Sequence, residues 1–536
     1  MTEAIMHTQT IGQAAPATTA PVTPASGIPT PTRKLGTFSI AMMIVAASAP
    51  LTVIAGGAPS SFAVSGITSV PAAYLVLAAV LALFAFGYAA MARHITNPGA
   101  FYAYVARGLG RPLGVASAIG AMVSYLAMEF GIFGMFGFTV ADWLTVRFGL
   151  ETSWWMWALA GVLIVGVLGM WRIDFSARVI AVLVALEFLA VGVVDAVGLG
   201  AAPEGYPLDA INPASLITPE VGVLLAFGVA AFMGFESAAI YAHEAKNPRT
   251  TIGRATFLAV IGVGLFYSIS AWALTVGVGP SQVVAQSEEL GPGIVFALIG
   301  AHLPEVVVDI VNALFITSLF AALLSFHNAV SRYIAELGRE RVAPQVFAKR
   351  TENGAPIVGS LTQTVLSIIV TLGFVLGDPG DPLYPVLTMF TWLTNTGAFG
   401  LVLLMCFVAV AIIAFFIRDD RGVGAWSRLF APAIAAMALG AVFILVLVNF
   451  PLMLGQEEAD LLTWILPSLV IVPGALGFAW GSCLRSARPE AYAGIAADMD
   501  APTGVIPIVH PAPGADRAPF MADAHEPAPG APATRR

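Results

Sequence analysis

Apolar runs of about 20 residues recur along this chain, and they constrain its fold more than any other feature. At about 1.5 Å per residue, each run is long enough to cross a hydrocarbon core of about 30 Å. We therefore predict about twelve membrane-spanning helices. Their starts lie near Phe38, Pro71, Leu113, Trp154, Arg178, Val221, Arg254, Val306, Pro356, Leu383, Leu429 and Leu462.

Composition agrees with a chain that lies mostly in lipid. Apolar residues make up 58% of the sequence, charged residues only 10%, and the mean hydropathy is +0.86, which is far outside the usage of soluble domains. The runs show none of the period-two alternation of a membrane β-barrel. We expect an all-α integral membrane protein.

Basic residues predict the topology, because short loops rich in Lys and Arg stay on the cytoplasmic side. With the N-terminus inside, Arg147 is the single one of the 24 Lys and Arg residues that falls in an outer loop. The outer loops carry acids instead. We predict a multi-pass protein of the cell membrane with both termini in the cytoplasm. No basic, aromatic-interleaved patch indicates a nucleic-acid partner, so the bilayer is the expected surrounding.

Two predicted helices contain their own breaking points. In "VAASAPLTVIAGGAPSSF" Pro50 removes an N–H in mid-span, and in the sixth helix Gly234 is followed by an acid. Backbone groups freed in hydrocarbon need polar partners, and broken helices serve transporters as substrate sites. The alternative is that these small residues only mediate helix packing. The predicted substrate-binding residues are Ala49, Pro50, Leu51, Thr52, Gly56, Phe232, Gly234, Phe235 and Glu236.

Breaks in the first and sixth helices predict an inverted repeat of five helices plus five. The first repeat spans residues 35–200 and the second spans 201–420, with two further helices in 421–488. The segments 1–34 and 489–536 are rich in Ala and Pro, so we expect disordered cytoplasmic tails.

The run "GFESAAIYAHEAKNPRTTIGRA" resembles the helix-6 signature E-x-K-N-P-x-x-x-I-P-x-A of the amino acid–polyamine–organocation (APC) superfamily. His243 and Gly253 depart from that pattern. "NPGAFYAYVARGLGRPLG", "SRYIAELGRERVAP" and the predicted tenth helix are similar to further family segments, so that the resemblance covers roughly residues 35–418. The matching positions in the signature are Glu244, Lys246, Asn247, Pro248, Ile252 and Ala255.

The resemblance implies a LeuT-type fold and alternating access, with the substrate held between helices 1, 3, 6, 8 and 10. The family's glycine-rich break in helix 1 falls on Pro50-Leu51-Thr52 here, where no glycine is present. Because proline has no N–H, capture of a substrate carboxylate by backbone donors is weakened.

Acids inside the spans are functional hypotheses, because burying them in lipid is costly. Glu187 stands where some proton-coupled relatives have a lysine. It either binds and releases a proton, ligates sodium together with a hydroxyl such as Ser325, or is a protonated packing residue. We expect a proton rather than sodium as the coupling ion, and no other cofactor or metal.

Other polar and aromatic residues have two interpretations each. Glu236 either meets a substrate amine or orients the unwound segment. Glu129 either lines the pocket, as Tyr125 would, or pairs with another helix. His327 is either a gate or proton relay, or a hydrogen-bonded interior histidine. The aromatic residues Phe232, Phe235 and Trp392 are candidate gates, and the alternative is ordinary packing.

The function these features predict is secondary active transport of an amino acid or related amine such as a polyamine. No His-Glu-x-x-His, Gly-x-Ser-x-Gly or phosphate-cradling motif indicates an enzyme. The second hypothesis is an amine sensor or receptor on the same fold that has lost transport.

Overall fold

Long apolar helices dominate the computed structural model, which describes residues 36–95, 99–171, 177–235, 245–352, 354–456 and 458–497. Every described residue belongs to a single unit that ends at Ala497. The secondary-structure elements of this part of the chain are all helical, as predicted. The first half comprises α1 (Thr37–Ser48), α2 (Pro50–Thr52), the π-helical Val53–Gly57, α3 (Ala58–Ser65), α4 (Val70–Ala92), α5 (Ala100–Gly108), α6 (Arg111–Phe148), α7 (Trp154–Trp171) and α8 (Ala177–Ala201).

The second half is also helical. It comprises the 3₁₀ turns Asp209–Ile211 and Pro213–Leu216, α9 (Val221–Ala231), α10 (Pro248–Val278), α11 (Val283–Leu290), α12 (Gly293–Gly300), α13 (Glu305–Arg339), the 3₁₀ turn Gln345–Ala348, α14 (Ile357–Leu376), the π-helical Tyr384–Phe390, α15 (Thr391–Arg418), the π-helical Trp426–Phe430, α16 (Ala431–Val448), α17 (Phe450–Met453), α18 (Leu461–Ala487) and α19 (Pro489–Gly494).

Eleven helices in the described ranges are long and apolar enough to cross a membrane. The segments α1 to α3 count as one of these, Thr37–Ser65. The predicted sixth helix corresponds to α9, whose described part has 11 residues. The observed starts lie within a few residues of the predicted ones, because the length of an apolar run is set by the bilayer.

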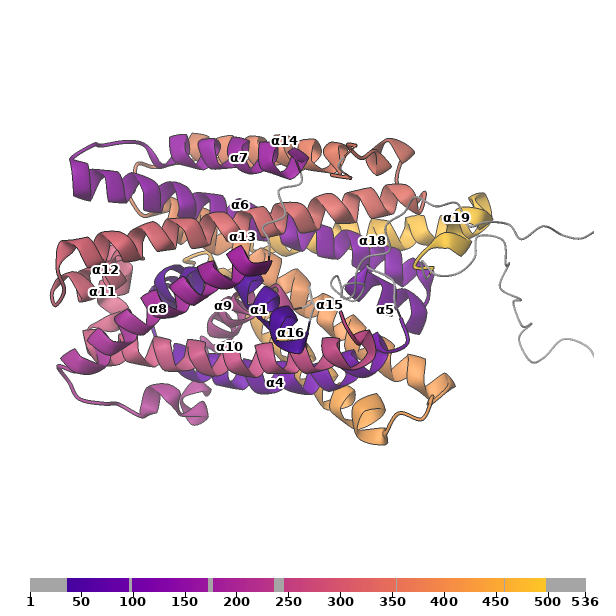
Figure 1. Ribbon diagram of the computed structural model, residues 1–536, viewed down its shortest axis with the longest axis horizontal. Helices are drawn as coiled ribbons and strands as arrows, with labels where there is room; N and C mark the ends of the chain where they lie inside the picture. The colour runs from indigo at the N-terminus through magenta and orange to yellow at the C-terminus, as the bar shows by residue number, and fades with distance from the viewer. Residues whose placement is uncertain are drawn as a thin grey trace, which may run out of the picture. The chain divides into compact units, whose positions relative to one another are not determined.

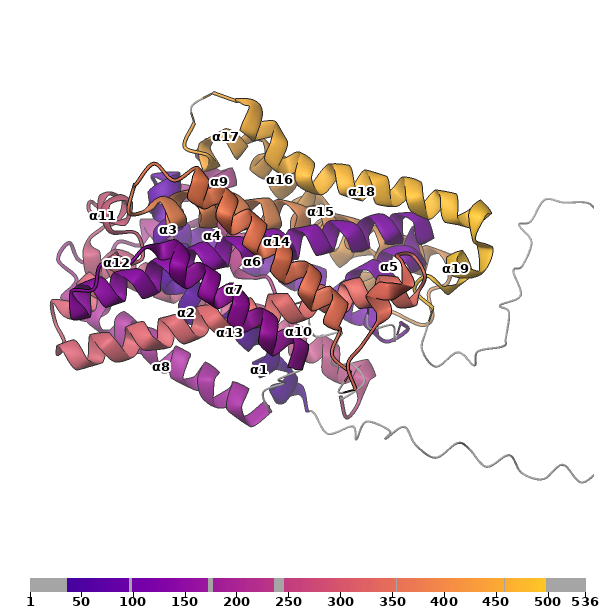
Figure 2. The same cartoon turned by 90° about the horizontal axis from the view of Figure 1, so that it is seen from above.

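Small residues let the helices approach closely, as is usual in membranes. On α10, a Cβ added at Gly264 would lie 2.3 Å from the Ala78 Cβ of α4. On α18, a Cβ at Gly481 would lie 2.9 Å from the Pro112 Cα of α6. Helices α4 and α10 run side by side in Figure 1, and α6 and α18 do so in Figure 2. Glycine at such positions therefore fixes which helices are neighbours.

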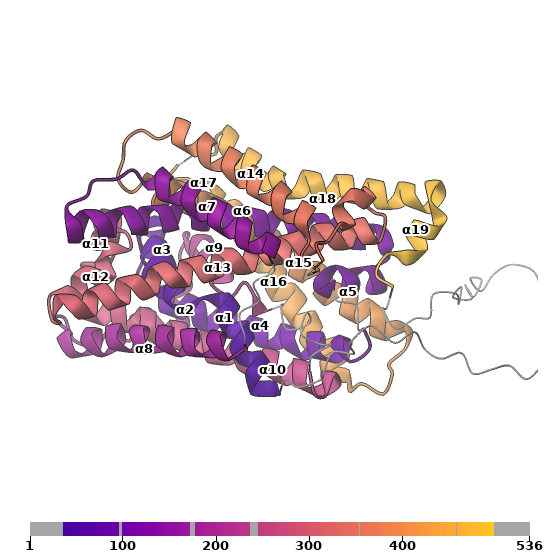
Figure 3. The same ribbon diagram turned by 45° about the horizontal axis from the view of Figure 1, so that its top comes forward.

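The long helices α6 and α13 form part of the frame on which the rest of the bundle packs. Figure 3 shows α7 and α14 together on one side of them. The contact is tight, since a Cβ at Gly166 of α7 would lie 2.4 Å from the Thr364 Oγ1 of α14. The short α1 and α2 lie in the interior, next to α8 and α13.

The structure differs from the prediction at residues 489–497. Residues 489–497 were expected in a disordered tail, but α19 follows α18 directly and the chain is described to Ala497. The Arg111 guanidinium donates to the Ala493 carbonyl at 3.1 Å and lies 5.2 Å from the centre of the Tyr492 ring. This segment is anchored by contacts that its Ala- and Pro-rich composition does not reveal. The predictions for residues 1–34 and 498–536 lie outside the described residues.

Candidate substrate-binding site

The helical path of the first span is interrupted at Ala49. Helix α1 ends at Ser48, Ala49 has the left-handed backbone angles φ 45° and ψ 73°, and α2 begins at Pro50. A left-handed conformation costs an L-residue about 1–2 kcal/mol, and Pro50 has no N–H to continue the ladder. The backbone of this span is therefore irregular at Ala49, directly before Pro50.

Side chains from other helices satisfy the backbone groups that this interruption frees. The Tyr267 hydroxyl donates to the Ser48 carbonyl at 3.1 Å. The Leu51 N–H donates to Glu187 Oε2 at 3.3 Å, whereas in a regular helix it would reach the Ala47 carbonyl four residues earlier. Glu187 of α8, only 6% exposed, thus replaces a backbone acceptor, and within the described chain no hydrogen bond reaches the Ala47 carbonyl.

The hydroxyl group nearest to this arrangement differs from the predicted one. Thr52 Oγ1 lies 3.0 Å from Ser318 Oγ of α13. Ser325 is exposed, and its hydroxyl donates to the Ala321 carbonyl of its own helix at 2.9 Å. Seven residues separate Ser318 from Ser325, which is two turns or about 10.5 Å along a helix. The hydroxyl beside Thr52 is therefore that of Ser318, and the alternative in which Ser325 ligates sodium with Glu187 stays a prediction.

A second irregular segment meets the first. Helix α9 ends at Ala231, and the chain then turns through Gly234, whose φ is 106°. A Cβ at Gly234 would lie 2.9 Å from the Ala47 Cβ. Only glycine combines this backbone angle with so close an approach. Glu236, the predicted amine contact, lies outside the described residues.

A small internal cavity of about 50 Å³ lies beside both irregular segments. It has room for a few water molecules. No residue that lines it in the described chain is charged, and its side-chain polar groups are the hydroxyls of Ser48, Thr52 and Thr394. The remaining lining residues are Ala47, Ala49, Val53, Gly57, Met128, Ile132, Phe227, Ala230, Ala231, Met233, Ala322, Phe326 and Phe390.

Two predicted binding residues, Ala49 and Thr52, line this cavity. Pro50 and Leu51 are buried next to it in α2. Gly56 serves packing, since a Cβ there would lie 3.2 Å from the Met135 Cε of α6. The sequence missed Met128, Ile132, Phe326 and Phe390, which carry no signal that separates them from other apolar residues.

The four predicted aromatic positions are not part of the described lining. Phe232 and Phe235 are each 2% exposed, and their rings lie 6.0 Å from those of Tyr267 and Phe84 respectively. The Tyr125 ring lies 6.0 Å from that of Phe326. Tyr125 therefore packs against Phe326, which lines the cavity, and does not line it itself. Trp392 contacts the Phe374 ring at 6.4 Å on α14.

Glu129 and His327 belong to a separate buried cluster. His327 Nδ1 lies 3.0 Å from Glu129 Oε1, and His327 Nε2 lies 2.7 Å from Ser360 Oγ. The Gln363 side-chain amide donates to Glu129 Oε2. Glu129 and Gln363 are 0% exposed and His327 is 1% exposed. The cluster joins α6, α13 and α14, so Glu129 pairs with another helix and His327 is a hydrogen-bonded interior residue.

A third buried acid, Glu340, directly follows α13. The Tyr102 hydroxyl and the Ala496 N–H donate to its Oε1 at 2.8 and 3.1 Å. Burial raises the pKa of Glu340 from 4.5 to about 7, although these two donors oppose the shift. Sequence reasoning did not select Glu340, because it stands in a charged loop-like stretch.

The fold and the interrupted spans define the class of protein. A solved manganese transporter of Eremococcus coleocola aligns with 85% of this chain and 97% of its own, with a TM-score of 0.51 and 15% sequence identity. That likeness shows the fold, which is all-helical and of LeuT type.

The family follows from the sequence itself. The profile of the amino acid permease family matches residues 35–473. The chain belongs to this family, within the APC superfamily, and is a multi-pass membrane protein.

Several characterised relatives are transporters. A putrescine transporter of Haemophilus influenzae is 29% identical over 30% of this chain and 36% of its own length. A lysine-specific permease of Lactococcus lactis is 29% identical over 37% of each chain. A histidine permease of the same bacterium is 27% identical over 57% of this chain and 65% of its own. These matches cover less than two thirds of each relative.

Proposed function

We propose that this protein is a secondary active transporter that carries an amino acid or a related amine across the cell membrane by alternating access. The observation that carries the proposal is the small cavity at the meeting point of two irregular helix segments, with Glu187 hydrogen-bonded to one of them. Membership of the amino acid permease family and the named activities of its relatives support it.

An amine is the substrate group that the described cavity favours. The hydroxyls of Ser48 and Thr394 are oriented to donate to carbonyls of their own helices, which leaves their lone pairs as acceptors for an ammonium group. The Ala47 carbonyl offers another acceptor. A substrate carboxylate would have to compete with Glu187 for the Leu51 N–H, and Pro50 has none to give.

We further propose that Glu187 couples transport to the proton gradient. Its carboxylate is held by the Leu51 N–H at the interruption, so a change of its charge alters the acceptor on which α2 depends. Opening of the cavity hydrates the carboxylate and closing dehydrates it, which shifts proton affinity between the two states. We also propose that both termini lie in the cytoplasm, because the loops rich in Lys and Arg are expected on that side of the membrane.

The test is transport in proteoliposomes with labelled putrescine, lysine and histidine, under an imposed pH gradient and with or without sodium. Glu187→Gln should abolish gradient-driven accumulation yet keep exchange of internal for external substrate. The matched control is Asp195→Asn, because Asp195 is an acid of the same helix whose carboxylate accepts from Ser270 Oγ at 2.8 Å, whereas that of Glu187 accepts from the Leu51 N–H at the interruption.

Three results would contradict the proposal. Accumulation unchanged in Glu187→Gln would remove Glu187 from coupling, and dependence on sodium would replace the proton. Binding of these amines without exchange or uptake would favour the sensor hypothesis.

A further inference from the structure

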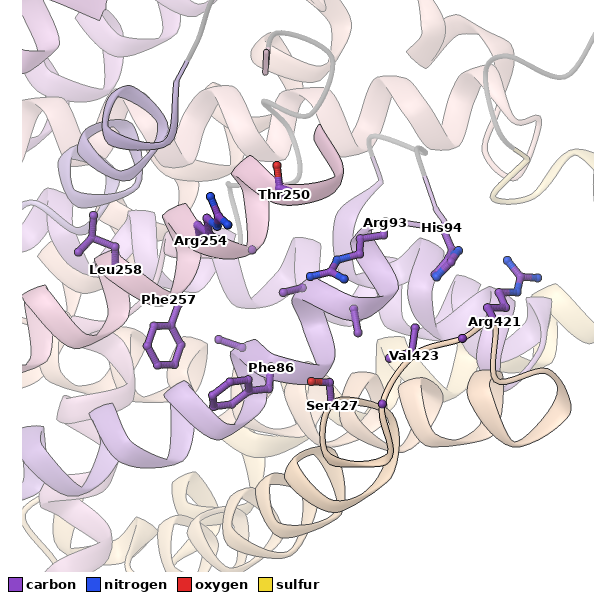
Figure 4. Close-up of a pocket in the computed structure, with 16 residues that line it drawn as sticks. Phe86, Arg93, His94, Thr250, Arg254, Phe257, Leu258, Arg421, Val423 and Ser427 are labelled. Atoms are coloured by element: carbon purple, nitrogen blue, oxygen red, sulfur yellow. The ribbon is translucent and has the colours of Figure 1, made fainter. Parts of the chain in front are cut away.

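A second and much larger cavity lies at one end of the bundle, away from the substrate cavity. Its volume is about 680 Å³, and it lies between the end of α4, the start of α10 and residues 421–427. Figure 4 shows Arg93 and Phe86 reaching into it from α4 and the turn that follows, with Arg254 and Phe257 on the facing side of α10. This cavity shares no lining residue with the cavity of the proposed transport site.

Close helix packing closes the inner side of this cavity. A Cβ at Gly253 would lie 2.4 Å from the Ala89 Cβ, so the start of α10 lies directly on α4. This explains a position where the chain departs from the family signature. Aromatic rings form the apolar wall, since the Phe86 ring lies 5.2 Å from that of Phe257 and 6.4 Å from that of Trp426.

The charged residues that line this cavity in the described chain are all arginines. Its sixteen described lining residues include Arg93, Arg254 and Arg421 and no acid. Within the described residues, neither Arg93 nor Arg254 forms an ion pair, and both are exposed. Two guanidinium groups, each with several hydrogen-bond donors, thus share one concave surface without a counter-charge from the residues that the structure describes.

The neighbouring charged groups do not neutralise this pair. The Arg421 guanidinium lies 3.4 Å from Asp419 and 4.6 Å from the centre of the Phe415 ring, and Figure 4 shows it turned away from Arg93. The Asp420 carboxylate is bound to Arg428 at 2.9 Å. His94, the remaining titratable lining residue, packs against Phe416 with 5.8 Å between ring centres.

The position of the cavity indicates what occupies it. Arg93 follows α4, which ends at Ala92, and Arg254 lies in the second turn of α10, which begins at Pro248. Because the ends of membrane-spanning helices lie near the lipid headgroups, we place both arginines at that depth. Leu258 and Phe86 are 51% and 36% exposed, which continues the apolar wall towards the hydrocarbon core. A phosphate group with acyl chains matches this order of arginines followed by apolar side chains.

We propose that this cavity binds the phosphate headgroup of an anionic phospholipid from the leaflet that the basic loops face, through Arg93 and Arg254. The acyl chains lie along Phe86, Phe257 and Leu258. The bound lipid fills the space between α4, α10 and the loop that leads to α16, and it links these three parts of the bundle.

The experiment measures lipid retention by native mass spectrometry and thermal stability of the purified full-length protein. The probes are phosphatidylglycerol, phosphatidylcholine and inorganic phosphate. Wild type should retain and be stabilised by phosphatidylglycerol in preference to phosphatidylcholine. The Arg93→Gln, Arg254→Gln double variant should bind phosphatidylglycerol roughly thirtyfold more weakly, as expected from the contribution of two arginines near an anionic surface.

Two controls separate this site from general charge and from misfolding. The Arg485→Gln, Arg488→Gln double variant removes the same charge from exposed residues outside the cavity and should behave as wild type. The Arg93→Lys, Arg254→Lys variant keeps the charge and should retain most binding. Equal loss of lipid in both glutamine variants would overturn the proposal, as would stabilisation by inorganic phosphate equal to that by phosphatidylglycerol, which would indicate a soluble phosphate ligand.

Discussion

The buried cluster around Glu129 offers the sharpest test of how the helix frame is held together. Glu129→Ala removes the hydrogen-bond partner of both His327 Nδ1 and the Gln363 amide, whereas Glu129→Gln keeps the shape of the side chain and one oxygen acceptor. The cluster is fully inside the protein, so water does not replace the lost partner. The alanine variant should therefore be much less stable than the glutamine variant.

The magnitude follows from the two polar groups, His327 Nδ1 and the Gln363 amide, that are left unpaired. A buried unsatisfied donor costs about 1–3 kcal/mol, whereas measured hydrogen bonds between membrane helices average about 0.6 kcal/mol and reach about 1.7. Two unpaired polar groups and the lost side-chain volume give an expected destabilisation of about 2–4 kcal/mol for Glu129→Ala. Replacing the acid by the amide should cost about 1 kcal/mol, the value of one ordinary hydrogen bond.

The assay is thermal unfolding of purified protein in one detergent, with Glu129→Ala, His327→Ala and the double variant compared with wild type. Because both residues share one bond, the double variant should lose clearly less than the sum of the two single losses. Additive losses, or an alanine variant as stable as Glu129→Gln, would refute the argument that this cluster joins α6, α13 and α14.

Three further predictions concern other parts of the molecule. Since burial raises the pKa of Glu340 to about 7, the folded state holds a proton that the unfolded state releases above about pH 4.5. This stabilisation should be complete below pH 4.5 and lost as the pH rises through about 7; melting curves from pH 5 to 8 should show it, and Glu340→Gln should flatten the trend. Gly234→Ala should abolish uptake, because its φ is 106° and the new Cβ would lie 2.9 Å from the Ala47 Cβ; normal uptake would contradict this geometry. Arg147→Ala breaks the ion pairs with Glu305 and Asp309. Because these groups are partly exposed, the free energy of unfolding derived from melting curves should fall by no more than about 1 kcal/mol. A larger loss of stability would contradict this estimate for the two ion pairs.

Much of the architecture could be predicted because it follows from the bilayer. Apolar runs gave the helix starts, and Pro50 located the interruption that the structure places at Ala49. A covalent feature of one residue, the missing N–H of proline, is enough for such a prediction.

Partners that come from distant helices could not be predicted in the same way. Glu187 was selected for its charge, but its contact with the Leu51 N–H depends on how α8 packs against α2. The contact of Gln363 with Glu129 could not be predicted, because a single amide in an apolar helix belongs to no sequence pattern that identifies its partner. Ser318 and Ser325 lie on one helix two turns apart, and only the packing decides which one faces Thr52.

The most direct test of proton-coupled amine transport is the internal pH of proteoliposomes that contain an entrapped pH indicator. Addition of external putrescine or lysine to wild type or Asp195→Asn should acidify the interior in proportion to the substrate taken up. Glu187→Gln should show no acidification. Substrate uptake by wild type without any change of internal pH would contradict the account.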